Sequence, residues 1–168
     1  MTLAELNALP HDRAEEELRK CCGSTVWAGR MSRSRPFASF DRLTQAAGEI
    51  WWRLDRADWM EAFRAHPQIG GRQAAAHTSA EAQAWSVQEQ AGISRAGVRL
   101  ASELEEANQE YLAKFGYIFI VCASGKSADE MLSILRSRLP NSPDQEIRVA
   151  AEEQNKITCL RLEKLLSA

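Results

Sequence analysis

The sequence predicts one all-α domain over residues 1–168, a bundle of about seven to eight helices. Apolar residues recur at helical spacing through most of the chain, and capping residues stand where the helices would begin. Only residues 117–123 have the β-branched and aromatic composition of a strand, so this strand has no partner with which to form a sheet. The length of 168 residues allows one sizeable core.

Composition excludes several classes of function. The 21 basic and 23 acidic residues give a net charge of -2, so we expect no nucleic-acid partner and no membrane partner. The longest apolar run, residues 117–123, is too short to span a bilayer, and the first residues lack the pattern of a secretory signal. The four cysteines lack Cys-x-x-Cys spacing and indicate reduced thiols, so we expect a cytoplasmic protein.

The first third of the chain predicts short helices. Thr2 and Glu5 have the spacing of a capping box, Pro10 ends that helix, and a charged helix follows over residues 12–22. Residues 26–27 then predict only a short helical turn.

A basic loop is predicted over residues 31–36, with its arginines in solvent unless one of them binds an anionic substrate. Ser39 and Asp55 can cap the next two helices. The first of these carries an apolar stripe of Phe40, Leu43, Ala47, Ile50, Trp51 and Leu54. Core positions are expected for three tryptophans, which are Trp51, Trp52 and Trp59. The alternative places one of them on the wall of a pocket.

The helix that begins at Asp55 delivers the chain to a bend at His66. Pro67 disfavours the helical conformation for the residue before it, so His66 stands at a helix end. Gly70 and Gly71 then allow a turn or a close approach to a ligand. Histidine can transfer protons near neutral pH, but a helix end with an exposed histidine explains the same pattern.

A polar cluster lies on the next predicted helix, which begins at Thr78 or Ser79. Ser86, Glu89 and Gln90 are spaced i, i+3 and i+4, so they share one face. Glutamate and glutamine can bind the N–H groups of a ureido or amide compound. The alternative is an ordinary solvated face.

A long helix is predicted from Ser94 to Gly116. Asn108 interrupts its apolar stripe, and we expect the amide to hydrogen-bond locally. The stripe consists of Val98, Ala101, Leu104, Tyr111 and Phe115. Residues 117–123 follow as an extended segment whose backbone groups need partners, and a ligand rich in amide and carbonyl groups is one economical partner.

Two further helices complete the chain. Ser127 and Glu130 form a capping box, and the last helix covers about residues 143–166. Arg161 lies on the mostly apolar side of that helix, where a guanidinium group needs an anion. Its partner is either a protein carboxylate such as Glu89 or the carboxylate of a substrate, which arginine binds through two parallel hydrogen bonds.

Several familiar motifs are absent or incomplete. Residues 124–127 resemble the end of a phosphate-binding loop, but the required earlier glycine and the strand–loop–helix context are missing. The histidines at positions 11, 66 and 77 lack metal-ligand spacing, so we expect no metal site. The remaining pattern favours acid–base chemistry, without a cofactor, on a small nitrogen-rich anion.

Short stretches that cover nearly the whole chain match one known family in order and at compatible spacing. They are Arg35-Pro36-Phe37, Glu61-Ala62-Phe63, His66-Pro67-x-Ile69-Gly70, Ser86-x-x-Glu89-Gln90, Asn108-x-x-Tyr111-x-x-Lys114-Phe115-Gly116-Tyr117, Phe119-Ile120-Val121-Cys122-Ala123, Ala151-Glu152-Glu153-Gln154-x-Lys156-Ile157 and Leu160-Arg161-Leu162. With them the chain resembles the OHCU (2-oxo-4-hydroxy-4-carboxy-5-ureidoimidazoline) decarboxylases, which act between urate and allantoin. Gln68 departs from the charged residue expected there.

The resemblance implies decarboxylation of OHCU to (S)-allantoin without a metal or organic cofactor, usually by a homodimer. It makes His66 the acid–base residue, with Glu89 and Arg161 as its catalytic partners. The substrate itself accepts the electrons that the lost carboxylate leaves behind, through its C=N bond. The residues implied to bind the substrate are Pro67, Ser86, Gln90, Phe119, Ile120, Val121, Cys122 and Ala123.

Two alternatives belong to other classes of function. A helical interaction module without activity would not accelerate the formation of chiral allantoin. A hydrolase of a related ureide or hydantoin would release no carbon dioxide.

Overall fold

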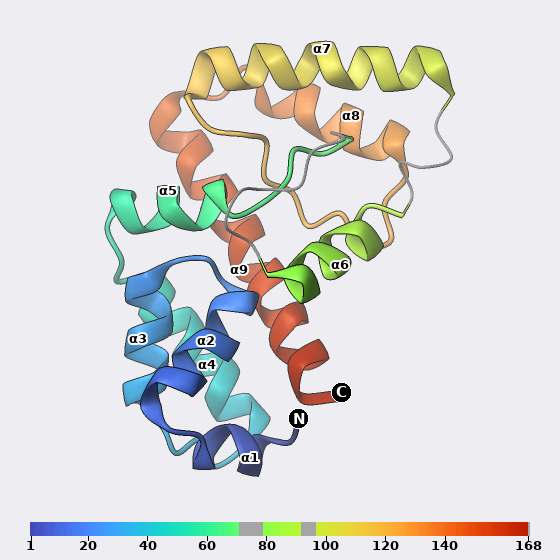
Figure 1. Cartoon of the computed structure of the whole chain (residues 1–168). Coiled ribbons are helices and arrows are strands. Elements are labelled where there is room, and N and C mark those ends of the chain that lie inside the picture. Colours follow the sequence, from blue (N-terminus) through green and yellow to red (C-terminus); the bar gives the residue numbers. More distant parts are fainter. Residues whose placement is uncertain (71–78, 92–96, 168) are drawn as a thin grey trace. The chain divides into compact units, whose positions relative to one another are not determined.

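A computed structural model of the chain describes residues 1–70, 79–91 and 97–167. These described residues form nine α-helices and no strand (Figure 1), so the predicted all-α class is confirmed. Packing divides the chain into two compact units, Met1–Ala62 with Asn155–Ala168, and Phe63–Gln154. No helix in the described residues is long and apolar enough to cross a membrane.

The first unit is built from short helices with well-defined starts. Thr2 forms the predicted capping box with Glu5, Ser39 accepts a hydrogen bond from the backbone of Arg42, and Asp55 accepts one from the backbone of Asp58. Its helices are α1 (Leu3–Ala8), α2 (His11–Cys21), α3 (Thr25–Arg33), α4 (Phe40–Trp51), most of α5 (Arg56–Arg64) and the end of α9 (Pro143–Ser167).

Helix α3 corrects two predictions at once. The expected short turn is a full helix capped by Ser24, which extends through Met31, Ser32 and Arg33 of the expected loop. It also raises the helix count above seven to eight.

Arg35 corrects the prediction of solvated arginines. Its guanidinium group donates to the carbonyl oxygens of Leu6 at 2.6 Å and of Leu9 at 2.8 Å, and its Nε donates to Ser32 O at 2.9 Å. The last carbonyl groups of a helix lack partners within the helix, and Arg35 supplies donors to those of α1. Arg35 therefore joins the end of α1 to the end of α3 through hydrogen bonds.

Tryptophans form much of the core of the first unit. Trp27 and Trp51 are fully or almost fully buried, and the indole N–H of Trp27 donates to Ala47 O at 3.1 Å. Trp52 is 44% exposed, so the prediction of a core position is wrong for this side chain. Phe40, the first residue of the predicted stripe, is 37% exposed. Both side chains lie at the ends of α4, where fewer neighbours cover them.

The second unit contains α6 (Ala80–Glu89), α7 (Val98–Phe115), α8 (Ala128–Arg138), the end of α5 and the first part of α9. Helices α7 and α8 lie side by side (Figure 1). Ser79 caps α6, Ser127 forms the predicted capping box with Glu130, and Gly116 ends α7 in the left-handed conformation, with φ of 79°. Thr78, Gly71, Gly92 and Ser94 lie outside the described residues.

The apolar stripe of α7 is shorter than predicted. Leu104, Tyr111 and Phe115 are buried, but Val98 is 90% exposed and Ala101 is also exposed. The structure describes the helix from Val98 onward, and Ser94, where the prediction begins it, lies outside the described residues.

A buried ionic cluster supports the extended segment 117–123. Arg138 forms an ion pair with the fully buried Glu146, and its Nη1 donates to Ile120 O at 2.7 Å. The hydroxyl of Tyr111 donates to Glu146 at 2.5 Å, and burial raises the pKa of this phenol, which therefore stays protonated. The cluster satisfies buried charges and fixes the segment.

Candidate active site

His66 follows the end of α5, as predicted. Its backbone N–H donates to Phe63 O at 3.2 Å in the last turn. Its Nε2 lies 2.7 Å from Oε1 of Gln154, a fully buried residue of α9. An amide oxygen only accepts hydrogen bonds, so with Oε1 of Gln154 as the acceptor this bond needs a hydrogen on Nε2.

The bend after His66 is held at a single peptide group, the one that joins Ile69 to Gly70. Its carbonyl oxygen accepts a hydrogen bond from Nδ2 of Asn108 at 2.9 Å, and its N–H donates to Oε1 of Gln90 at 3.0 Å. Gly70 has φ of 73°, a conformation that other residues rarely adopt. The predicted turn is therefore present at Gly70.

The polar cluster of α6 has three different environments. Ser86 is buried and its hydroxyl donates to Ala82 O at 3.0 Å, whereas Glu89 and Gln90 are half-buried at the end of the helix. Because Oε1 of Gln90 already accepts from Gly70, its NH₂ group is the donor that it can offer a ligand. The cluster is therefore not a simple solvated face.

The extended segment has several backbone partners within the protein. Cys122 N–H donates to Glu153 at 2.7 Å, Cys122 O accepts from Nζ of Lys126 at 2.7 Å, and Ala123 O accepts from Lys126 N at 3.0 Å. The need for backbone partners is thus met in part by side chains, Arg138 included. Phe119, Ile120, Val121, Cys122 and Ala123 are all buried.

Two consecutive residues of α9 bind the extended segment and His66. Glu153 binds the extended segment at Cys122, and Gln154 binds His66. Burial raises the pKa of the Cys122 thiol, the Lys126 ammonium group lowers it, and the Glu153 and Glu89 carboxylates raise it again. The bend, the end of α6 and segment 119–123 therefore come together in the second unit.

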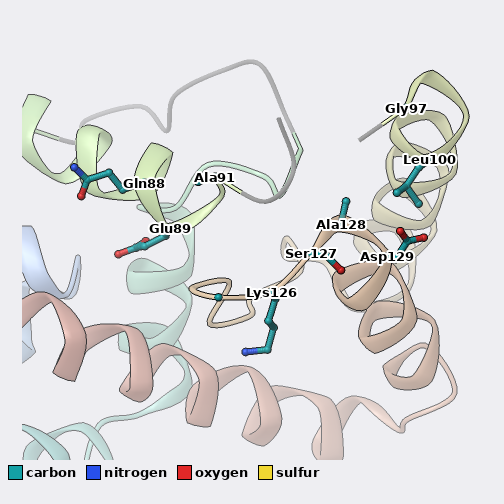
Figure 2. Close-up of a pocket in the computed structure, with 10 residues that line it drawn as sticks. Gln88, Glu89, Ala91, Gly97, Leu100, Lys126, Ser127, Ala128 and Asp129 are labelled. Carbon is teal, nitrogen blue, oxygen red and sulfur yellow. The ribbon is translucent and has the colours of Figure 1, made fainter. Parts of the chain in front are cut away.

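A cavity of about 530 Å³ opens beside Glu89. Figure 2 shows Glu89 at the end of α6 and Lys126 on the loop before α8, with Ser127 and Asp129 at the start of that helix. His66 does not line this cavity. The cavity therefore holds charges of both signs and only one of the predicted catalytic residues.

Arg161 belongs to the first unit. It is buried, and its Nη1 donates to Lys20 O at 3.4 Å, in the last turn of α2. Cys22 lies close to it, and burial raises the pKa of that thiol to about 12. A carbonyl at the negative end of a helix suits a guanidinium group.

Among the described residues, no three His, Cys, Asp or Glu side chains gather as metal ligands. His11 lies beside Asp12 and Glu15 on the exposed side of α2, and His77 lies outside the described residues.

The sequence model of one family, OHCU decarboxylase, matches residues 7–163. The chain belongs to the OHCU decarboxylase family. The predicted family is thereby confirmed, and with it the carboxy-lyase class and the link to urate degradation. The match extends through both compact units.

Relatives with this name come from distant organisms. The chain is 30% identical over 172 residues to 2-oxo-4-hydroxy-4-carboxy-5-ureidoimidazoline decarboxylase of Amia calva, covering 99% of this chain and 95% of the relative. It is 41% identical over 154 residues to the uric acid degradation bifunctional protein TTL of Arabidopsis thaliana, covering 91% of this chain. In that bifunctional relative the matched part is only 47% of the length.

Two solved structures share the fold. A crystal structure of OHCU decarboxylase in the presence of (S)-allantoin superimposes with a TM-score of 0.79 at 38% identity, covering 91% of this chain and 99% of that one. A crystal structure of (S)-allantoin synthase, at 18% identity, has a TM-score of 0.75 and covers 99% of this chain and 54% of that one. The second likeness shows the fold alone.

Sequence reasoning missed Gln154 and Glu153, and its expectation of a local partner for Asn108 is wrong, because that partner is 39 residues away. Gln154, Glu153 and Asn108 bind His66, Cys122 and Ile69, respectively. Gln154 and Asn108 each interrupt an apolar helical stripe, and that interruption was the available signal. Gln68 is half-buried, and nothing in the structure explains its departure from the family.

Proposed function

We propose that the chain decarboxylates OHCU to (S)-allantoin, with His66 as its acid–base residue. The observation that carries this is the 2.7 Å hydrogen bond between His66 Nε2 and Gln154 Oε1. This bond orients the ring at the end of a helix, and a well-oriented proton donor is what general acid–base catalysis needs.

The reaction balances without an external oxidant or reductant. The C–C bond to the carboxylate breaks, carbon dioxide leaves, and the electron pair passes into the adjacent C=N bond of the ring. The hydroxyl group becomes a carbonyl as its proton is lost, and the former C=N nitrogen takes up a proton to become an N–H. His66, as the imidazolium, delivers a proton to the ring carbon that bears the ureido group, and delivery from one side gives the (S) product.

The other predicted residues orient the substrate. Glu89, Ser86 and Gln90 hold the ureido and ring groups, with Pro67 and the backbone of residues 119–123 against the heterocycle. Arg161 binds the anionic end through its two parallel donors. Positioning of this kind lowers the barrier by several kcal/mol.

The remaining parts of the proposal follow from the resemblance. The chain acts as a homodimer in the cytoplasm, and residues 1–168 make one functional domain. The substrate is its own electron sink, so the proposed reaction uses no cofactor.

Replacing His66 tests the proposal. With freshly prepared OHCU, we expect His66→Asn to form (S)-allantoin no faster than the spontaneous reaction, with an unchanged circular dichroism spectrum of the protein. His11→Asn, on the exposed side of α2, is the matched control and should keep wild-type activity. Measuring carbon dioxide release together with the enantiomer formed separates decarboxylation from hydrolysis. Full activity of His66→Asn would overturn the role of His66.

A further inference from the structure

Two side-chain amides hold the same peptide group of the bend. Asn108 reaches from α7 to the carbonyl oxygen of Ile69, and Gln90 reaches from the end of α6 to the N–H of Gly70. A peptide group is planar and has one donor and one acceptor. With both atoms bound from different helices, it has little freedom to rotate.

The Ile69–Gly70 peptide group lies three residues beyond His66, and the backbone between them has little conformational freedom. Pro67 restricts its own φ, the Ile69 side chain is 6% exposed, and Gly70 adopts a left-handed φ of 73°. His66 is thus fixed by α5 before it and by the amide-held peptide after it. Rotation of the Ile69–Gly70 peptide would shift the His66 ring away from Gln154.

The buried amide of Asn108 is energetically unfavourable at its position in α7. It is 2% exposed, and within the described part of the chain its Oδ1 has no hydrogen-bond partner. A buried polar atom without a partner destabilises a fold. A leucine would pack better on the apolar side of α7. The amide therefore contributes through its one hydrogen bond to the bend.

We propose that Asn108 and Gln90 are positioning residues for the reaction, because together they lock the Ile69–Gly70 peptide and so aim His66. This inference rests on the proposed function. It gives Gln90 two tasks, since its oxygen holds the bend while its NH₂ group remains as a donor toward substrate. Asn108 acts only through the bend.

The first test replaces Asn108 by leucine in the full-length chain. We expect Asn108→Leu to lower kcat for OHCU by about tenfold to a hundredfold, because small misplacements of a catalytic group have effects of that size. KM should change little, and the melting temperature should stay equal to that of the wild type or rise. Hydrogen exchange at the Gly70 amide, measured by NMR, should become faster.

Asn7→Leu is the matched control. Asn7 is a half-buried amide of α1 in the first unit, where it binds both backbone groups of Phe37 rather than the bend. This variant should lose stability, keep the wild-type kcat and leave hydrogen exchange at Gly70 slow. If Asn108→Leu loses stability and keeps kcat, the residue is merely structural and the proposal is wrong.

A double-mutant cycle supplies the second test. Once Asn108→Leu has freed the peptide, adding Gln90→Leu should lower kcat by less than it does in the wild type, because both residues act on one group. Strictly additive effects on kcat would overturn the shared role. A wild-type chain inactive on OHCU would overturn the proposed function and this role with it, whereas an active wild type with an unaffected Asn108→Leu would overturn only the positioning role.

Discussion

At the scale of single residues, two groups of the proposed reaction are held differently. A side-chain amide, that of Gln154, binds the imidazole of His66. A backbone carbonyl, that of Lys20, accepts from the guanidinium group of Arg161. The first contact orients a ring, and the second orients a planar donor group.

Arg161→Lys tests whether that planar group matters. We expect kcat/KM for OHCU to fall by about a hundredfold, because an ammonium group cannot make the two parallel hydrogen bonds of a guanidinium. Arg148→Lys, at an exposed position of the same helix, should leave both constants unchanged. Steady-state kinetics on the two variants give the answer. Unchanged kinetics in Arg161→Lys would make Arg161 a structural residue.

Cys22 carries a prediction about pH. Burial raises the pKa of its thiol to about 12 from an ordinary 9.0, so the folded protein keeps it protonated at pH 8–9. Alkylation by iodoacetamide, mapped by mass spectrometry, should therefore modify the half-buried Cys159 well before Cys22. Because the unfolded thiol ionises first, its contribution to stability falls as pH rises above about 9. Rapid labelling of Cys22 in the folded protein would contradict this.

Sequence alone singled out His66 at its helix end but not the residue that binds its ring. The helix end and Pro67 are local signals, whereas Gln154 lies 88 residues away along the chain. A stripe of apolar residues shows that a polar interruption has a partner, but not which one. The same limit applies to Asn108 and Ile69, which are 39 residues apart.

At the scale of helices, the starts were predictable and the burial at the ends was not. The caps at Thr2, Ser39, Ser79 and Ser127 depend on residues within three positions of each other, and all four are present. Burial of Phe40 or Val98 depends on neighbours from other helices, and the apolar period of one helix does not reveal them.

The buried pair of Arg138 and Glu146 carries the prediction at this scale. Arg138→Met leaves the Glu146 carboxylate buried without its cation, and we expect a loss of about 3–5 kcal/mol in the free energy of unfolding. Arg136→Met breaks an exposed pair with Glu103 and should reduce the free energy of unfolding far less. Urea denaturation measures both. Equal losses would show that burial of the pair is unimportant.

At the scale of the whole molecule, two helices are shared between the compact units. The division falls between Ala62 and Phe63 within α5 and between Gln154 and Asn155 within α9. Continuous helices resist local breaks because every interior N–H is hydrogen-bonded to a carbonyl. We therefore expect the two units to unfold together.

Asn155→Pro tests this cooperativity. Proline inside a helix costs about 3 kcal/mol and interrupts it at the boundary between the units. Calorimetry should show one transition for the wild type and two for the variant. Asn155→Ala removes the same side chain but keeps the helix, so it should retain one transition. Two transitions in the wild type would contradict the prediction.

The division of the chain also has a consequence for the order of synthesis. Residues 63–154 form one unbroken compact unit, whereas residues 1–62 need residues from 155 onward to complete theirs. A ribosome adds about 5–20 residues per second, so the first-made segment waits on the order of 5–20 s for its last helix to emerge. The later-made unit can therefore finish folding first, and slow translation of α9 would lengthen the exposure of the earlier one to aggregation.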